Sequence, residues 1–193
     1  GKYIEPFSDE DVSHNMVISM NGFEINENDE ENQIHTKVSY FSLPEEKVGA
    51  LVRKVTITNT GDQKIDLDVL DGMPACIPYG VDMGSMKNMG QTIKAWMQVE
   101  DVEKNLPYYR VRISTTDTAD VTQIEGGNFS FASLADGTRL KPIVDPEIIF
   151  SYDTSLDRAV GFEELGTKGL LEQKQVTQNQ LPSSFYATSK ELN

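Results

Sequence analysis

The sequence has little of several residue types on which common functional sites depend. Its 193 residues include one cysteine, two histidines and one tryptophan, and 17 Lys and Arg stand against 31 Asp and Glu. The single cysteine, Cys76, cannot form an internal disulfide, which favours a reducing compartment. A formal net charge of −14 excludes nucleic-acid binding as the expected function, because phosphate neutralisation needs an excess of cationic side chains.

Long apolar runs are also missing. No stretch approaches the roughly 18 apolar residues of a membrane-spanning helix, and no basic segment followed by an apolar one opens the chain. We therefore expect no membrane partner and a cytoplasmic location. What is there is ordinary for a folded domain, with 38% hydrophobic and 25% charged residues. A chain of this length buries roughly 70% of its unfolded surface, so a stable core can form.

Apolar residues recur mostly with period two in short runs, which is typical of β-strands. The dipeptide Asn21-Gly22 predicts a hairpin with a type I′ turn, and the nearly all acidic and amide segment 24–33 predicts a solvated loop. A further strand is predicted over residues 34–43. Within residues 48–71, two alternating segments flank a Gly-Asp turn and predict a hairpin whose apolar residues face one core.

The middle of the chain mixes loop, helix and strand signals. Residues 71–82 contain two prolines and two glycines, which predicts an ordered extended loop, and residues 83–90 predict a short helix. Residues 92–100 fit both a helical and a strand period. The strand is favoured because residues 108–113 clearly form a strand that needs a partner. A Gly-Gly pair inside residues 121–134 predicts one more hairpin.

These elements together predict a mostly β fold, an antiparallel β-sandwich with few short helices. We expect a single domain over residues 1–193, with an ordered core at about 12–155 and a peripheral, extended or linker-like segment at 156–193. The first residue is Gly1 and the last residues lack a closing element. The sequence therefore reads as a fragment of a larger protein.

The residues of metal and nucleophilic sites occur without the required spacing. His14 and His35 lie on separate predicted strands, and no Cys or His pair has ligand spacing. The acidic segment 26–32 lacks the residue order of an EF-hand loop. No G-x-S-x-G motif occurs, and Cys76 between two apolar residues is typical of a buried thiol. We expect no catalytic residue, no metal and no cofactor in this chain.

Carbohydrate binding is the one chemistry for which suitable residues gather. Sugars need aromatic rings for their apolar faces and carboxylate, amide or guanidinium groups for their hydroxyls. Candidates for substrate binding lie on and after the proline-containing loop: Asp71, Tyr79, Asp82, Trp96, Tyr108 and Arg110. A core role stays open for two of these positions, because Trp96 and one of the tyrosines at 108 and 109 must point inward on a two-sided strand.

Two adjacent stretches carry a family resemblance. Residues 52–62 (VRKVTITNTGD) and 65–69 (IDLDV) resemble the N-terminal β-sandwich domain of inverting glycoside phosphorylases, the family of cellobiose phosphorylase (glycoside hydrolase family 94, formerly glycosyltransferase family 36). The resemblance covers roughly residues 34–150. It is extended by Leu70-Asp71-Gly72, Pro78-Tyr79-Gly80, Lys94-Ala95-Trp96-Met97, Tyr109-Arg110-Val111-Arg112 and Asp145-Pro146. After Val69, where the family usually has a Glu-aromatic pair, the sequence has Asp71-Gly72-Met73-Pro74.

The resemblance implies a supersandwich like that of galactose mutarotase, followed by an (α/α)6 barrel that carries out phosphorolysis with inorganic phosphate as co-substrate. The general acid and the phosphate site belong to that barrel, so this chain inherits neither. The implied partners are a carbohydrate, the catalytic barrel and a second copy in a homodimer. Residues 71–82 are the loop expected at the mouth of the active site.

Two other functions stay open. A stand-alone carbohydrate-binding or surface adhesion module would have the same strand pattern. An isolated mutarotase-like enzyme is disfavoured, because its chemistry needs a histidine and a carboxylate on one face, and both histidines lie within the first 35 residues.

Overall fold

The computed structural model describes residues 1–8, 11–81, 83–114, 119–120 and 122–193. One domain is expected from the sequence, and the chain divides into two compact units. The first unit comprises Gly1–Leu67 and Lys190–Asn193, and the second comprises Asp68–Ser189. The division falls inside β5 (Ile65–Met73) and β10 (Ser184–Leu192), so each of these strands contributes residues to both units.

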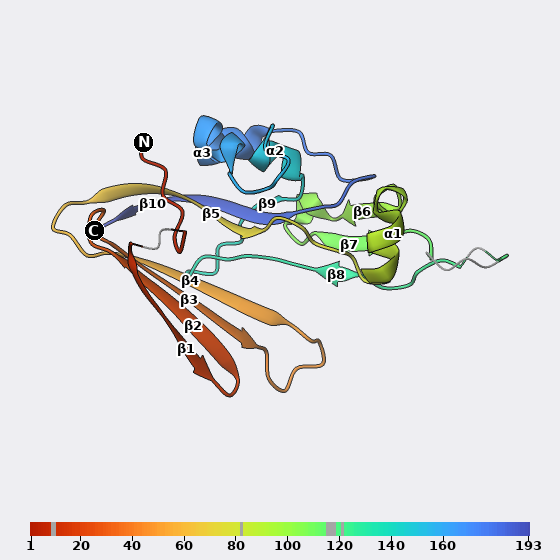
Figure 1. Cartoon of the computed structure of the whole chain (residues 1–193), viewed down its shortest axis with the longest axis horizontal. Coiled ribbons are helices and arrows are strands. Elements are labelled where there is room, and N and C mark those ends of the chain that lie inside the picture. Colours follow the sequence, from red (N-terminus) through yellow and green to blue (C-terminus); the bar gives the residue numbers. More distant parts are fainter. Residues whose placement is uncertain (9–10, 82, 115–118, 121) are drawn as a thin grey trace. The chain divides into compact units, whose positions relative to one another are not determined.

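The first unit is built on a four-stranded antiparallel sheet (Figure 1). Its strands follow in sequence order, each hydrogen-bonded to the next: β1 (Ser13–Ser19), β2 (Gly22–Asp29), β3 (Ile34–Ser42) and β4 (Leu51–Asn59). The N-terminal hairpin and the strand predicted over residues 34–43 are confirmed. The loop of the hairpin consists of Met20 and Asn21. Neither has a positive φ, so the turn is not of type I′.

A row of apolar residues crosses all four strands of this sheet. Met16 lies opposite Ile25, Ile25 opposite Val38, and Val38 opposite Val55. Directly opposed residues point to the same face, so the row is a continuous apolar strip. Exposure is 1% at Val38 but 59% at Met16, on the edge strand. The strip is therefore buried in the middle of the sheet and open at β1.

The solvated loop predicted over residues 24–33 is wrong, because β2 runs through this segment to Asp29. Glu27 and Asp29 are buried, with 5% and 8% of their surfaces exposed. The backbone N–H of Phe7 donates to the Glu27 carboxylate, and Asn32 donates to Asp29. Acidic composition predicted solvation, but these local donors make burial of the two carboxylates tolerable.

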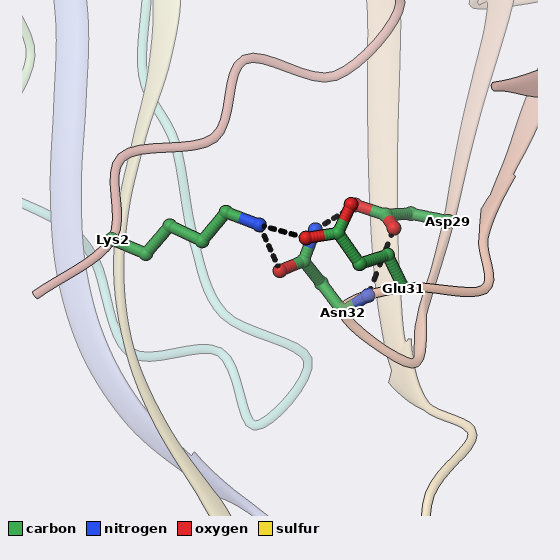
Figure 2. Close-up of polar contacts among 4 residues, drawn as sticks. All are labelled: Lys2, Asp29, Glu31 and Asn32. Carbon is green, nitrogen blue, oxygen red and sulfur yellow. Dashed lines mark hydrogen bonds and ion pairs between the residues drawn. The ribbon is translucent and has the colours of Figure 1, made fainter. Parts of the chain in front are cut away.

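Figure 2 shows how the turn after β2 is held. Asp29 accepts hydrogen bonds from the backbone N–H of Asn32 at 2.9 Å and from its side-chain amide at 2.5 Å. The Lys2 ammonium donates to Glu31 Oε1 at 2.9 Å and to Asn32 Oδ1 at 2.8 Å. The backbone bond from Asn32, followed by its side-chain bond and the charge of Lys2, lowers the pKa of Asp29. The side-chain oxygen atoms of this turn thus accept hydrogen bonds from Asn32 and from the Lys2 ammonium.

The second unit contains a three-stranded sheet with β10 in the centre, between β5 and β9 (Pro142–Ile143). Helices α2 (Pro146–Phe150) and α3 (Val160–Glu172) lie next to each other beside this sheet (Figure 1). The helices and the sheet share one apolar core: Ile143, Ile149, Phe150, Ala159, Leu170, Phe185 and Ala187. α2 begins where the Asp145 carboxylate accepts a hydrogen bond from the N–H of Glu147 at 3.1 Å, with Pro146 in the first turn.

The C-terminal segment differs from the peripheral, linker-like chain expected over residues 156–193. It forms α3 and the central strand β10, and it supplies buried Leu170, Phe185 and Ala187 to the core. The apolar pattern did not reveal this strand because β10 buries its first four residues, Ser184 to Ala187, and two of them carry hydroxyl groups. The loose apolar pattern of this segment therefore hid a central strand.

A second three-stranded sheet of this unit consists of β6 (Met97–Glu100), β7 (Tyr108–Val111) and β8 (Asn128–Phe129), in that order. Helix α1 (Met83–Lys94) precedes it, and the short 3-10 helix η1 (Val102–Lys104) joins β6 to β7. Ile93 of α1 packs with Met97 and Val111 in a buried cluster. The predicted short helix is confirmed and extends to Lys94, and the strand predicted over residues 108–113 is confirmed up to Val111.

Two predicted strand pairings and the bounds of one predicted strand need correction. The two strands predicted within residues 48–71 exist, but β4 belongs to the first unit's sheet and β5 pairs with β10. The strand predicted over residues 92–100 is shorter than expected. The end of α1 comes first and β6 follows, because the helical and the alternating pattern occur one after the other, and β6 pairs with β7 as predicted. The hairpin predicted within 121–134 is also wrong. β8 pairs with β7, and the described residues 122–127 form no strand; Val121 lies outside the described residues.

The predicted mostly β fold with antiparallel sheets and few short helices is confirmed by the strand content and strand direction. The named strands pair antiparallel in every register that the structure gives, and the three α-helices are short. Among the described residues, no helix combines the length and the apolar character needed to cross a bilayer.

Candidate functional site

The candidate site lies on one face of the sheet formed by β6, β7 and β8. The opposite face is apolar, where Met97 pairs with Val111 and Val99 with Tyr109, all of them buried. On the candidate face, two polar pairs lie side by side and are partly exposed: Gln98 with Arg110 and Glu100 with Tyr108. Alternation along two short strands thus places an amide, a carboxylate, a guanidinium and a phenol on one surface.

Arg110 is the central cation of this surface. Its Nη1 atom lies 3.7 Å from Glu100 Oε1, and the Gln98 side-chain amide donates to the same Glu100 oxygen. The Arg110 side chain is 22% exposed, and its Nε atom is buried with no hydrogen-bond partner in the described structure. The three side chains therefore present hydrogen-bond donors and acceptors next to each other, which suits a ligand rich in hydroxyl groups.

The loop before α1 brings Tyr79 to the same surface. Tyr79 forms an isolated parallel bridge with Arg110, and its N–H donates to Asn128 Oδ1 at 2.5 Å. Buried Pro78 precedes it, while Tyr79 itself is 60% exposed. The proline anchors the loop, and the tyrosine ring stays accessible beside the Arg110 strand.

A pair of glycines lies against the two tyrosine rings. A Cβ atom at Gly126 would be 3.5 Å from the Tyr79 ring, and one at Gly127 would be 2.7 Å from Tyr108 Cζ. The same Cβ at Gly127 would also be 2.5 Å from the Tyr109 carbonyl oxygen, and Gly126 has a φ of +104°. Only glycine fits at both positions without a shift of the chain. The sequence predicted these glycines as a hairpin turn and missed their contact with the rings.

The other predicted site residues are placed less favourably. Asp71 lies partly exposed on β5, which continues to Met73, so the extended loop begins later than residue 71. Trp96 packs against the cluster around Ile93, which is the core role that the sequence left open. Asp82 lies outside the described residues. The structure therefore brings together Tyr79, Tyr108 and Arg110 and adds Gln98 and Glu100, which the sequence analysis did not single out. Asn128 lies opposite Tyr109, and its side chain accepts a hydrogen bond from the Tyr79 backbone.

A buried hydroxyl network lies behind this sheet. The Tyr109 hydroxyl donates to the Ser183 carbonyl at 3.2 Å and lies 3.3 Å from Ser130 Oγ. Ser130 Oγ is also 2.7 Å from the Tyr186 hydroxyl and accepts a hydrogen bond from Ser184 Oγ at 2.9 Å. Burial raises the pKa of both Tyr109 and Tyr186 above the usual value of a phenol. The phenols therefore stay protonated and join β7 to β10.

The described residues form neither a metal site nor a reactive thiolate. No group of three or more His, Cys, Asp or Glu side chains in these ranges could hold a metal ion. Cys76 packs against Val99, Tyr109 and Val144, and burial raises its pKa to about 11. A thiol in this environment is protonated at neutral pH and is a weak nucleophile.

No model of a protein family matches the chain, and no sequence among the curated proteins matches it.

Proposed function

We propose that this chain is a noncatalytic β domain of a cytoplasmic glycoside phosphorylase, and that the face of Tyr79, Tyr108 and Arg110 contacts the carbohydrate substrate. One observation carries the proposal. An exposed tyrosine ring lies beside a guanidinium, a carboxylate and an amide side chain on one small surface. This is the combination that carbohydrate recognition needs, and it is assembled from residues far apart in the sequence.

Each group on this face has a defined part in the proposed complex. The ring of Tyr79 stacks on the apolar C–H face of a pyranose, with the dispersion and hydrophobic contact that aromatic side chains supply. Arg110 donates to sugar hydroxyl oxygens, while Glu100 accepts from sugar hydroxyl groups. Gly126 and Gly127 keep the rings free of neighbouring side chains.

The chemical step takes place elsewhere in this proposal. A phosphorolysis with inversion uses inorganic phosphate as its nucleophile and co-substrate and needs one general acid, so the face need not supply either. The catalytic barrel that the family resemblance implies would supply the acid. The β domain would hold the sugar and shape the substrate site, which requires no cofactor.

Carbohydrate titrations of Tyr79 variants test the proposal. We expect the full chain to bind disaccharides such as cellobiose, and Tyr79→Ala to raise Kd at least about tenfold, since a lost stacking contact of about 1.4 kcal/mol has that effect. Tyr79→Phe keeps the ring and should bind as the unaltered chain does. Tyr152→Ala removes another exposed tyrosine, 75% exposed in the same unit, and is the matched control. Unchanged affinity of Tyr79→Ala contradicts the proposal.

A stand-alone carbohydrate-binding or adhesion module is the second candidate. It is favoured by the position of the site, because every residue of the candidate face lies within the second unit. Phosphate consumption distinguishes the two functions. A protein that carries this domain and releases a sugar phosphate from a disaccharide supports the phosphorylase, whereas binding without phosphate consumption supports the module.

A further inference from the structure

We propose that strand β1 is a self-association site, at which a second copy of this chain adds its own β1 antiparallel and extends the sheet from four strands to eight. The inference is independent of the carbohydrate site, because β1 belongs to the first unit.

β1 is an open edge in the described structure. It stands at the end of the strand order, next to β2, and all seven of its residues are exposed. An edge strand presents a row of backbone N–H and C=O groups on its free side, and a further strand can pair with that row. Met16, Val17 and Ile18 lie on this strand with 59%, 55% and 77% of their surfaces exposed.

The two edges of this sheet differ in charge. β4, at the other end of the strand order, carries Arg53 and Lys54, and charged side chains are a usual protection of an edge against pairing. β1 has the sequence SHNMVIS and contains no Asp, Glu, Lys, Arg or Pro. Two copies of a chain with a net charge of −14 repel each other. Two copies can approach each other along the uncharged strand β1 without bringing like charges together. This favours a second copy of the chain as the partner of β1.

The strand is also self-complementary. A two-fold axis through its central residue, Met16, would place Met16 opposite Met16 of the second copy and Ile18 opposite His14 of the second copy. Directly opposed residues share a face, so the apolar row of Val55, Val38, Ile25 and Met16 would continue across the joint into its symmetric counterpart. This gives the isologous contact of a closed dimer.

Disulfide trapping tests the contact and its register. In the full chain with Cys76→Ala, Met16→Cys places one thiol on the two-fold axis, where opposed Cα atoms lie about 4.5–5.5 Å apart, within disulfide reach. Ile18→Cys is the matched control on the same face and strand. Its two copies would be four residues apart along the pair, about 13 Å, which is too far. We expect mild oxidation to give a covalent dimer with Met16→Cys and none with Ile18→Cys.

Charge variants measure the same association without cross-linking. Met16→Lys and Met16→Glu should each halve the mass measured by light scattering, and an equimolar mixture of the two should restore the dimer. Met20→Lys adds the same charge at a turn residue that is 98% exposed and should leave the dimer intact. A chain that is monomeric throughout a concentration series overturns the proposal. So does a dimer that Met16→Lys leaves unchanged, or cross-linking of Ile18→Cys in place of Met16→Cys.

Discussion

Ser130 is the residue whose hydroxyl joins most of the buried polar contacts behind the candidate site. Its Oγ lies within hydrogen-bond distance of Tyr109, Tyr186 and Ser184. We expect Ser130→Ala to lower the free energy of unfolding by about 1–3 kcal/mol, because buried hydroxyls then lose a partner without access to water. Urea denaturation followed by circular dichroism measures this difference.

Ser133→Ala is the control for that prediction, since Ser133 is exposed in the same segment of chain. It should change the free energy of unfolding by no more than about 0.5 kcal/mol, as most exposed substitutions do. Equal effects of the two substitutions would show that the network contributes nothing specific to stability.

Among the elements, the connection between α2 and α3 depends on one carboxylate. Asp153 accepts hydrogen bonds from the hydroxyl and the N–H of Ser155 at 2.5 and 3.0 Å, and from the N–H groups of Asp157 and Arg158 at 2.9 and 2.6 Å. The Ser155 hydroxyl, followed by the Arg158 N–H, lowers the pKa of Asp153 to about 2. The ionised carboxylate thus organises the whole connection.

The pH dependence of this contribution has a definite sign. A carboxylate whose pKa is lower in the folded than in the unfolded chain stabilises the fold above the unfolded value of about 3.9, and the contribution is lost as the pH falls towards 2. We expect Asp153→Asn to lower Tm at pH 7 and to differ little from the unaltered chain near pH 2. Calorimetry over this pH range checks the expectation, and a Tm difference that is constant with pH would contradict it.

The elements also show what sequence reasoning reaches. Alternation correctly predicted the strand at residues 34–43 and both strands within 48–71, because facing one core imposes period two locally. It did not predict that β5 pairs with β10, more than a hundred residues later, since strand partners are chosen by non-local packing. The strand predicted over residues 92–100 pairs with β7 as expected, but its predicted start was wrong for a different reason. A helix end and a strand follow each other there within one window of the pattern.

The candidate site was predictable to the same extent. The sequence predicted Tyr79, Tyr108 and Arg110 because aromatic and cationic side chains suit sugar binding. The structure places Tyr108 and Arg110 on one face of β7 and Tyr79 next to Arg110. Gln98 and Glu100 gave no signal, because an exposed amide or carboxylate is common in so acidic a chain. Only the register of β6 with β7 selects these two from the other polar residues.

At the scale of the whole molecule, the single cysteine reports on the opening of the second unit. Cys76 donates its N–H to the Pro182 carbonyl at 2.7 Å and packs against the core residues Val99 and Tyr109. Burial raises its pKa to about 11, so its thiolate fraction at pH 8 is about a hundredfold below that of an ordinary thiol. We expect thiol-specific reagents to label the native chain at least about a hundredfold more slowly than the chain in urea.

A second cysteine position makes this labelling prediction decisive. Met20→Cys with Cys76→Ala carries its thiol on a turn residue that is 98% exposed in the first unit, and it should react at the rate of an unstructured peptide. Cys76 should approach that rate only as urea exposes the core of the second unit, so its labelling should follow the unfolding measured by circular dichroism. Equal labelling rates of the two native proteins would show that the core around Cys76 is open. They would also contradict the packing of this core against the sheet of β6, β7 and β8.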